Sequence, residues 1–122
     1  MERDEFESLV ERALLALPQE LQESIENVAV MVQDWPSRSQ LRDAGIGRWE
    51  GMLGLYEGIP HTERGISYNL VAPDRITLFQ RPIELICRSH EEMVEEIGRV
   101  VRHELAHHFG ISDVTLDEIE RE

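Results

Sequence analysis

The strongest constraint on the fold is one amphipathic stretch near the end of the chain, from Ser89 to Gly110. Its apolar residues recur at helical spacing, and at about 100° per residue they form a single face. That face comprises Met93, Val94, Ile97, Val100, Val101, Leu105 and Phe109. The opposite side comprises Glu95, Arg99, Arg102 and Ala106. The pattern therefore predicts a helix over residues 90–109 with one buried face.

The ends and the exposed side of this helix also have recognisable patterns. Ser89 is followed three residues later by Glu92, which is typical of a capping box. Gly110 is suited to end the helix in a left-handed conformation. Glu95 precedes Arg99 by four residues, which favours an ion pair on the exposed side.

The rest of the chain contains helical patterns and short apolar runs. The patterns predict helices over residues 3–16, 18–25, 37–44 and 81–88, and strands over 28–32, 52–58 and 75–80. The strands do not alternate regularly with helices, so the order predicts an α+β fold. We expect a small mixed or mostly antiparallel sheet of about three strands packed on helices. The length of 122 residues, without a linker or repeat, predicts a single domain over residues 1–122.

The charge of the chain excludes some classes of partner. The formal net charge is −13, and the excess of acids lies in residues 1–27 and 89–122. A phosphate-binding surface needs clustered cations, so neither nucleic acid nor an anionic membrane is an expected partner. The plain interpretation of the acidic ends is solvated helix faces. A single cysteine, Cys87, suits a reducing compartment, and no signal-peptide or membrane-span pattern is present, so we expect a cytoplasmic protein.

The segment VRHELAHHFGISD, residues 101–113, concentrates side chains that bind metals. His103 and His107 are four residues apart, so both imidazoles project from one side of consecutive helical turns. This arrangement suits two ligands of one zinc ion, each with a Zn–N distance of about 2.0–2.1 Å. Glu104 lies at the edge of the apolar face, where it can accept a proton from an attacking water molecule.

A third ligand requires the chain to turn after the helix. On a straight helix Asp113 would lie about 15 Å along the axis from His103. A break at Gly110 lets the chain fold back, which makes Asp113 the candidate third ligand. The alternative is that Asp113 caps a following short helix, in which case Asp117 or Glu118 could bind the metal instead.

Other polar residues have less specific interpretations. His108 points about 100° away from His107, so we interpret it as a supporting or structural residue. A long segment, residues 58–74, joins two predicted strands, and such segments often carry function. The candidates to stabilise an oxyanion are His61, Arg64, Tyr68 and Tyr56. For any single one of them, a solvated side chain is the alternative. Cys87 is interpreted as a small buried side chain.

The pattern H-E-x-x-H-x-x-G-x-x-D from His103 to Asp113 resembles the zincin metallopeptidases, and specifically the small bacterial family often called minimal zincins. Residues 53–64 and 74–84 are similar to other typical segments of that family, so the resemblance covers nearly the whole chain. It implies a sheet over the active-site helix. It also implies one Zn²⁺ per chain with the ligands His103, His107 and Asp113, and Glu104 as general base. Larger relatives usually have histidine at the position of Asp113.

The leading hypothesis is a zinc-dependent metallopeptidase that hydrolyses a peptide or protein substrate. The substrate would lie extended along an exposed strand edge, held by main-chain hydrogen bonds. The run at residues 75–80 is the candidate edge.

Two alternatives remain open at this point. One is a zinc-stabilised, non-catalytic module that binds a protein, which the small size favours; a purely structural site, however, needs no base such as Glu104. The other is a metal-dependent endoribonuclease, because one bacterial family spaces three histidines in the same way. The acidic charge and the presence of Glu104 argue against it.

Overall fold

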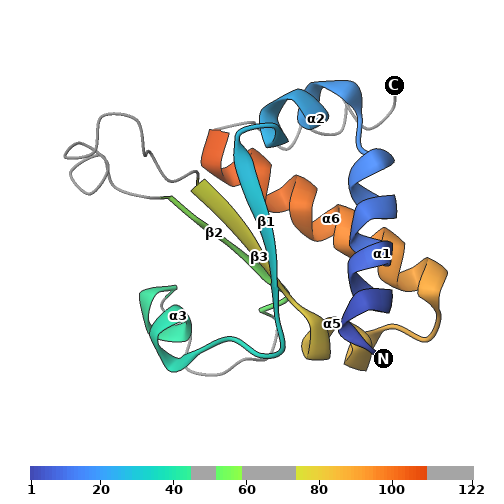
Figure 1. Cartoon of the computed structure of the whole chain (residues 1–122). Coiled ribbons are helices and arrows are strands. Elements are labelled where there is room, and N and C mark those ends of the chain that lie inside the picture. Colours follow the sequence, from blue (N-terminus) through green and yellow to red (C-terminus); the bar gives the residue numbers. More distant parts are fainter. Residues whose placement is uncertain (45–51, 59–73, 110–122) are drawn as a thin grey trace.

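The structure is a computed structural model of the chain (Figure 1), and it describes residues 1–44, 52–58 and 74–109. Its elements are α1 (Arg3–Leu15), α2 (Gln19–Ile25), β1 (Val28–Gln33), α3 (Arg38–Asp43), β2 (Gly54–Glu57), β3 (Asp74–Phe79), α5 (Gln80–Ile86) and α6 (His90–Phe109). These elements confirm the predicted α+β class, and each lies where the sequence predicts it. Within the described residues, no helix is long and apolar enough to cross a membrane.

The three strands form one mixed sheet in the order β1-β3-β2. β1 and β3 are parallel, with Val30 opposite Ile76. β2 and β3 are antiparallel, with Tyr56 also opposite Ile76. The prediction that residues 75–80 form an exposed edge is therefore wrong, because β3 is the central strand. Residues 76–79 are all buried, as expected for a strand with neighbours on both sides and cover on both faces.

The core lies between one face of this sheet and α6. Side chains alternate between the two faces of a strand, so Val30, Ile76 and Leu78 lie on the face that meets α6. Figure 1 shows α6 crossing behind the sheet, with α1 and α2 packed beside it. The buried apolar cluster comprises Phe6, Leu9, Val10, Ala13, Leu17, Leu21, Ile76, Leu78, Ile83, Met93, Ile97, Val100, Val101, Leu105 and Ala106.

The predicted apolar face of α6 is confirmed at Met93, Ile97, Val100, Val101 and Leu105, which are all buried. Val94 is partly buried against the same core, and the side chain of Phe109 lies outside the described residues.

Two predictions for the opposite side of α6 are wrong. Ala106 is only 3% exposed, because α1 and α2 pack against α6 in addition to the sheet and extend the buried area around the helix. Arg99 pairs with Glu96 rather than with Glu95, and its Nε donates to the Glu96 carboxylate at 3.0 Å. At the start of the helix, the amide of Glu92 donates to Ser89 Oγ at 3.1 Å, as the capping pattern predicts.

The other face of the sheet holds α3 through a polar network. Gln40 is 9% exposed, and its side-chain amide exchanges two hydrogen bonds with that of Gln33 on β1, at 3.0 and 3.1 Å. It also donates to Glu57 on β2 at 3.3 Å. Ser37 and Gln40 form a capping box at the start of α3. A buried amide with its partners satisfied fixes the helix against two strands at once.

The contact between β2 and α6 depends on a residue without a side chain. A Cβ atom on Gly54 would lie 2.5 Å from Cγ1 of Val100 and 3.3 Å from the carbonyl oxygen of Thr77. The first distance is shorter than real Cβ contacts allow, so any larger residue would push β2 away from α6. Gly54 therefore sets how closely this edge strand approaches the helix that carries the histidines.

We predict that Gly54→Ala lowers the free energy of unfolding by about 1–3 kcal/mol, because the new methyl group overpacks the contact with Val100. Gly58→Ala is the matched control, since a Cβ there meets nothing closer than 3.7 Å. Urea unfolding measures both variants. The loss should shrink when Gly54→Ala is made in a Val100→Ala background, and equal losses for Gly54→Ala and Gly58→Ala would contradict this account.

Candidate metal and catalytic site

The two histidines predicted to bind a metal lie on the last turns of α6, and both are exposed. The ring centroids of His103 and His107 are 6.4 Å apart, with 51° between the ring planes. Two imidazoles on one zinc ion, with Zn–N distances of about 2.0–2.1 Å, have centroids roughly 5 Å apart. Side-chain rotation closes that difference because exposed side chains are free to turn. The donor pair therefore fits a zinc ion.

The third ligand lies beyond the described part of the chain. Asp113 and its substitutes, Asp117 and Glu118, all follow Phe109 and so fall outside the described residues. Within residues 1–44, 52–58 and 74–109, no group of three His, Cys, Asp or Glu side chains gathers as a metal site. The assignment of Asp113 therefore stays a prediction.

Glu104 is in a different environment from the two histidines. Its carboxylate is partly buried and accepts a hydrogen bond from the backbone amide of Tyr56 on β2, at 3.1 Å. Burial raises the pKa of this carboxyl above its ordinary value, while the Tyr56 amide and the neighbouring His107 and His103 act in the opposite direction. A carboxylate that is oriented by the main chain and made more basic by burial is suited to accept a proton.

A small pocket adjoins Glu104 between β2 and α6. Its lining consists of Leu53, Gly54, Arg99, Val100, His103 and Glu104, and its volume is about 120 Å³. Since a water molecule occupies about 30 Å³ of liquid volume, the pocket can hold a few waters or one short side chain. Arg99 at this pocket donates to the Glu96 carboxylate, and this pair raises the pKa of the guanidinium. The sequence analysis did not place Arg99 at a pocket, because it assigned the residue only to the exposed side of the helix.

A stack of two rings lies next to this pocket on the same face of the sheet. The rings of Tyr56 and His108 are stacked, with centroids 3.8 Å apart and 14° between planes. The Tyr56 hydroxyl donates to Asp74 at 2.9 Å, and Nε2 of His108 lies 3.6 Å from the same carboxylate oxygen. This geometry agrees with His108 as a supporting residue that joins the end of α6 to β2 and β3.

The remaining candidates fall into two groups. His61, Arg64 and Tyr68 lie outside the described residues, so their proposed role at an oxyanion stays a prediction. Tyr56 is described, and its hydroxyl already donates to Asp74. Cys87 was predicted to be buried and is only partly buried against the core, and burial with nearby Glu96 raises the pKa of its thiol. A thiol with a raised pKa is a poor nucleophile at neutral pH.

Comparison with known protein families found a match over most of the chain. The sequence profile of a family described as zincin-like metallopeptidase matches residues 25–122. The chain therefore belongs to the zincin-like metallopeptidase family, and the resemblance inferred from the sequence is confirmed. No curated protein matches the chain significantly.

One solved structure with the same fold is a conserved hypothetical protein from Thermo thermophilus. The two chains are 21% identical, the alignment covers 89% of this chain and 94% of the other, and the TM-score is 0.54. At this level of identity the likeness concerns the fold alone.

We predict that Tyr56→Phe lowers the free energy of unfolding by about 1 kcal/mol, because it removes a partly buried hydrogen bond to a carboxylate. Urea unfolding of Tyr56→Phe, Asp74→Ala and the double variant measures the coupling between the two side chains. A coupling of about 1 kcal/mol is expected. Losses that simply add would show that the hydroxyl and Asp74 do not hold each other in solution.

Proposed function

We propose that this protein is a zinc-dependent metallopeptidase that hydrolyses peptide bonds. The observation that supports this most directly is the position of Glu104 beside His103 and His107, with its carboxylate turned toward the edge strand β2. Membership of the zincin-like metallopeptidase family adds the reaction class.

The proposed roles follow from the chemistry of each side chain. His103, His107 and Asp113 would hold the metal, as two neutral nitrogens and one carboxylate. A bound Zn²⁺ supplies Lewis acidity, which polarises a carbonyl group and lowers the pKa of water. Glu104 accepts the proton from the attacking water, and then donates it to the leaving amine as the peptide bond breaks. The hydrogen bond from the Tyr56 amide keeps that carboxylate directed toward β2.

We propose β2 as the strand edge that binds the substrate, in place of the edge first predicted at residues 75–80. The amide of Phe79 on β3 donates to the carbonyl of Leu53 at 2.9 Å. Because main-chain groups alternate along an antiparallel strand, those of Gly54 and Tyr56 face away from β3. The Tyr56 amide already donates to Glu104, so Gly54 is the residue whose main-chain groups would pair with a substrate. An extended peptide beside β2 would lie next to Glu104 and the small pocket. Since the pocket is small, we expect a narrow range of substrates.

The non-catalytic alternative has one observation in its favour. The Glu104–Tyr56 hydrogen bond gives this carboxylate a structural role, because it ties α6 to β2 even without a reaction. A zinc-stabilised module that binds a protein therefore remains the second candidate. Family membership does not support the endoribonuclease alternative. The tests below separate the two candidates that remain.

We predict that the purified protein binds about one zinc ion per chain, since His103, His107 and Asp113 would make one set of three ligands. Replacing His103 or His107 by alanine should abolish binding, because two ligands do not hold the metal. His90→Ala is the matched control, as His90 is an exposed histidine at the other end of α6. Elemental analysis and competition with a chromogenic chelator measure the content. Full zinc content in His107→Ala would refute the ligand set.

We predict that Glu104→Gln retains zinc and fold but loses hydrolysis by at least about a hundredfold, because an amide is not a general base. The glutamine carbonyl can still accept from the Tyr56 amide, so the contact between α6 and β2 is kept. Glu95→Gln removes an exposed carboxylate from the same helix and is the matched control. The assay is mass-spectrometric detection of products from an unstructured peptide library.

Two outcomes would count against the peptidase. Equal product formation by the wild type and Glu104→Gln would show that Glu104 is not the base. A zinc-loaded wild type that cleaves no peptide in the library, in the presence of intact fold and full metal content, would favour the binding module.

A further inference from the structure

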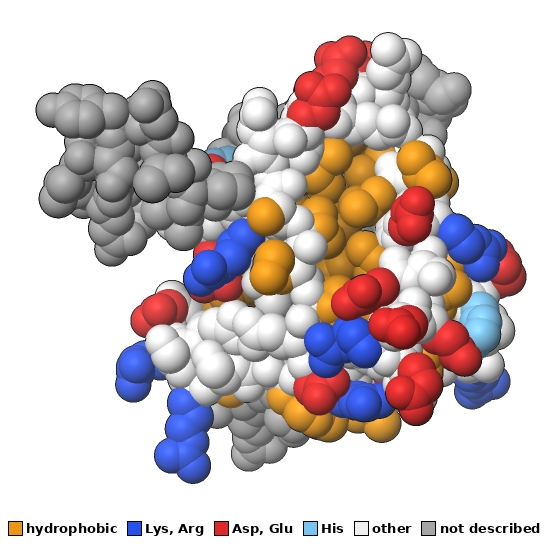
Figure 2. Space-filling view, in the orientation of Figure 1, with side chains coloured by type: hydrophobic (Ala, Val, Ile, Leu, Met, Phe, Trp, Pro, Cys, Tyr) orange, Lys and Arg blue, Asp and Glu red, His pale blue; other side chains and the backbone are white. Residues whose placement is uncertain are grey.

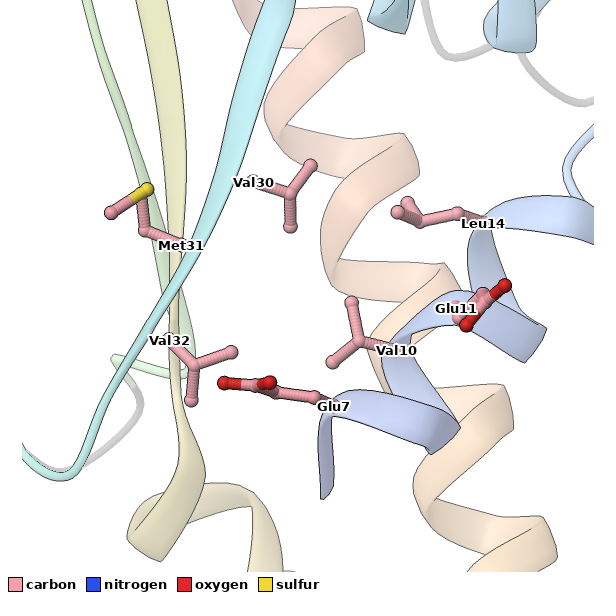
Figure 3. A pocket seen from close by; sticks show the side chains of 7 residues that line it. All are labelled: Glu7, Val10, Glu11, Leu14, Val30, Met31 and Val32. Atoms are coloured by element: carbon pink, nitrogen blue, oxygen red, sulfur yellow. The ribbon is translucent and has the colours of Figure 1, made fainter. Parts of the chain in front are cut away.

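An open apolar groove lies between α1 and β1, at the edge of the sheet opposite β2. Its volume is about 420 Å³, and Figure 2 shows it as a hollow floored by apolar side chains. In Figure 3, Val30 and Val32 point from β1 toward α1, and Leu14 points back toward them. The full lining is Glu7, Val10, Glu11, Leu14, Val30, Met31 and Val32.

β1 is an edge strand on the side of this groove. It pairs with β3 on one side, and no other described strand lies beside it. Arg3 on α1 donates to the carbonyl of Val32 at 3.1 Å, so this carbonyl faces α1 rather than β3. Main-chain groups of alternate residues face the same side of a strand, so those of Val30 face the same edge. The Val32 carbonyl is already held by Arg3, so an added strand would pair with Val30. An edge of this kind can pair with an additional strand.

The side chains of an added strand would form two alternating rows, one on each face of the sheet, and the residues around this edge suit both. One row would project onto the face that carries Val30 and Val32, and so into the groove. The other row would project onto the opposite face, beside Met31, which is 50% exposed. Both rows would therefore find apolar contacts, although only the inner row would be largely buried.

The rim of the groove is acidic. Glu7 and Glu11 lie four residues apart on α1, on the same side of the helix, and both are exposed. The two arginines of α1 are paired elsewhere: Arg3 with Asp34 and Arg12 with Glu91. Within the described part of the chain, no arginine pairs with Glu7 or Glu11, so an apolar groove is left with two carboxylates on one side.

We propose that this groove binds an extended segment of a partner protein by adding it as a strand beside β1, with apolar residues and an arginine or lysine together on the face of the strand that points into the groove. The strand edge supplies main-chain hydrogen bonds, the groove takes the apolar side chains, and Glu7 and Glu11 pair with the cations. The site lies on the sheet edge away from β2, so the inference does not rest on the proposed peptidase activity.

A second copy of this chain is a poorer occupant of the groove. Each copy carries a formal net charge of −13, and pairing two β1 strands would bring the rim carboxylates of both copies close together. Like charges in such an arrangement repel, and the repulsion opposes association. Charge therefore selects a cationic partner.

The test uses a fluorescein-labelled synthetic peptide of about six to eight residues, the length of a typical strand, with valine and arginine at every second position, on one face, and threonine between them. Fluorescence anisotropy with the full chain should show binding with a Kd on the order of 10⁻⁵ M at low salt. Two control peptides replace arginine by glutamate or valine by serine. Both should bind at least about tenfold more weakly, because each loses one of the two complementary features.

The protein variant that tests the rim is Glu7→Gln with Glu11→Gln, which should weaken binding by about tenfold. The matched control is Glu20→Gln with Glu23→Gln, which makes the same change of charge on the exposed side of α2 and should change binding less than about twofold. Peptides N-methylated at alternate amides test strand addition. Methylation of the alternate amides that would face β1 should abolish binding, whereas methylation of the other set of amides should not.

Several results would overturn the proposal. The groove does not bind such a segment if the peptide fails to bind at about 1 mM, or if the serine or glutamate peptide binds equally well. Equal losses for the two double variants would rule out a role of Glu7 and Glu11. Strand addition is wrong if N-methylation has no effect at either set of alternate amides. Sedimentation that shows a dimer dissociated by Val30→Arg, together with no peptide binding, would assign the groove to a second copy instead.

Discussion

The approach of β2 to α6 is the contact on which the rest of the site depends. Gly54 lets the strand come within van der Waals reach of Val100, and one turn further along the helix Glu104 accepts the amide of Tyr56. Because the packing contact and the hydrogen bond lie so close together, each holds the other in register. These two contacts therefore fix β2 beside the part of α6 that carries Glu104 and the two histidines.

The sequence predicts the helices well because burial gives them a periodic signal. The apolar face of α6 could be read directly, since Ile97, Val101 and Leu105 repeat at helical spacing and are all buried. The partner of Arg99 could not be predicted from the sequence, because positions three and four residues away on a helix are both within reach and side-chain rotamers decide between them. The burial of Ala106 depends on where α1 and α2 pack, which no local pattern records.

Neither the order of the strands in the sheet nor the hydrogen-bond partner of Glu104 could be predicted from the sequence. Strands appear along the chain as β1, β2, β3, but β3 lies in the middle of the sheet, and an apolar run does not reveal its neighbours. The partner of Glu104 is a backbone amide, which every residue except proline carries, so no residue type signals it. In contrast, the motif from His103 to Asp113 and the segments 53–64 and 74–84 indicated a family that the match over residues 25–122 confirms.

The pairing of β1 with β3 has a consequence for how the chain folds. Val28 and Asp74 are partners although they are 46 residues apart (74 − 28), and Arg12 of α1 meets Glu91 of α6 across 79 positions. Contacts between distant segments carry the entropy cost of closing long loops, and they slow folding relative to local contacts. We therefore expect α6, whose hydrogen bonds are local, to form before the sheet, and the rate of folding to be limited by the meeting of α1 and β1 with α6 and β3.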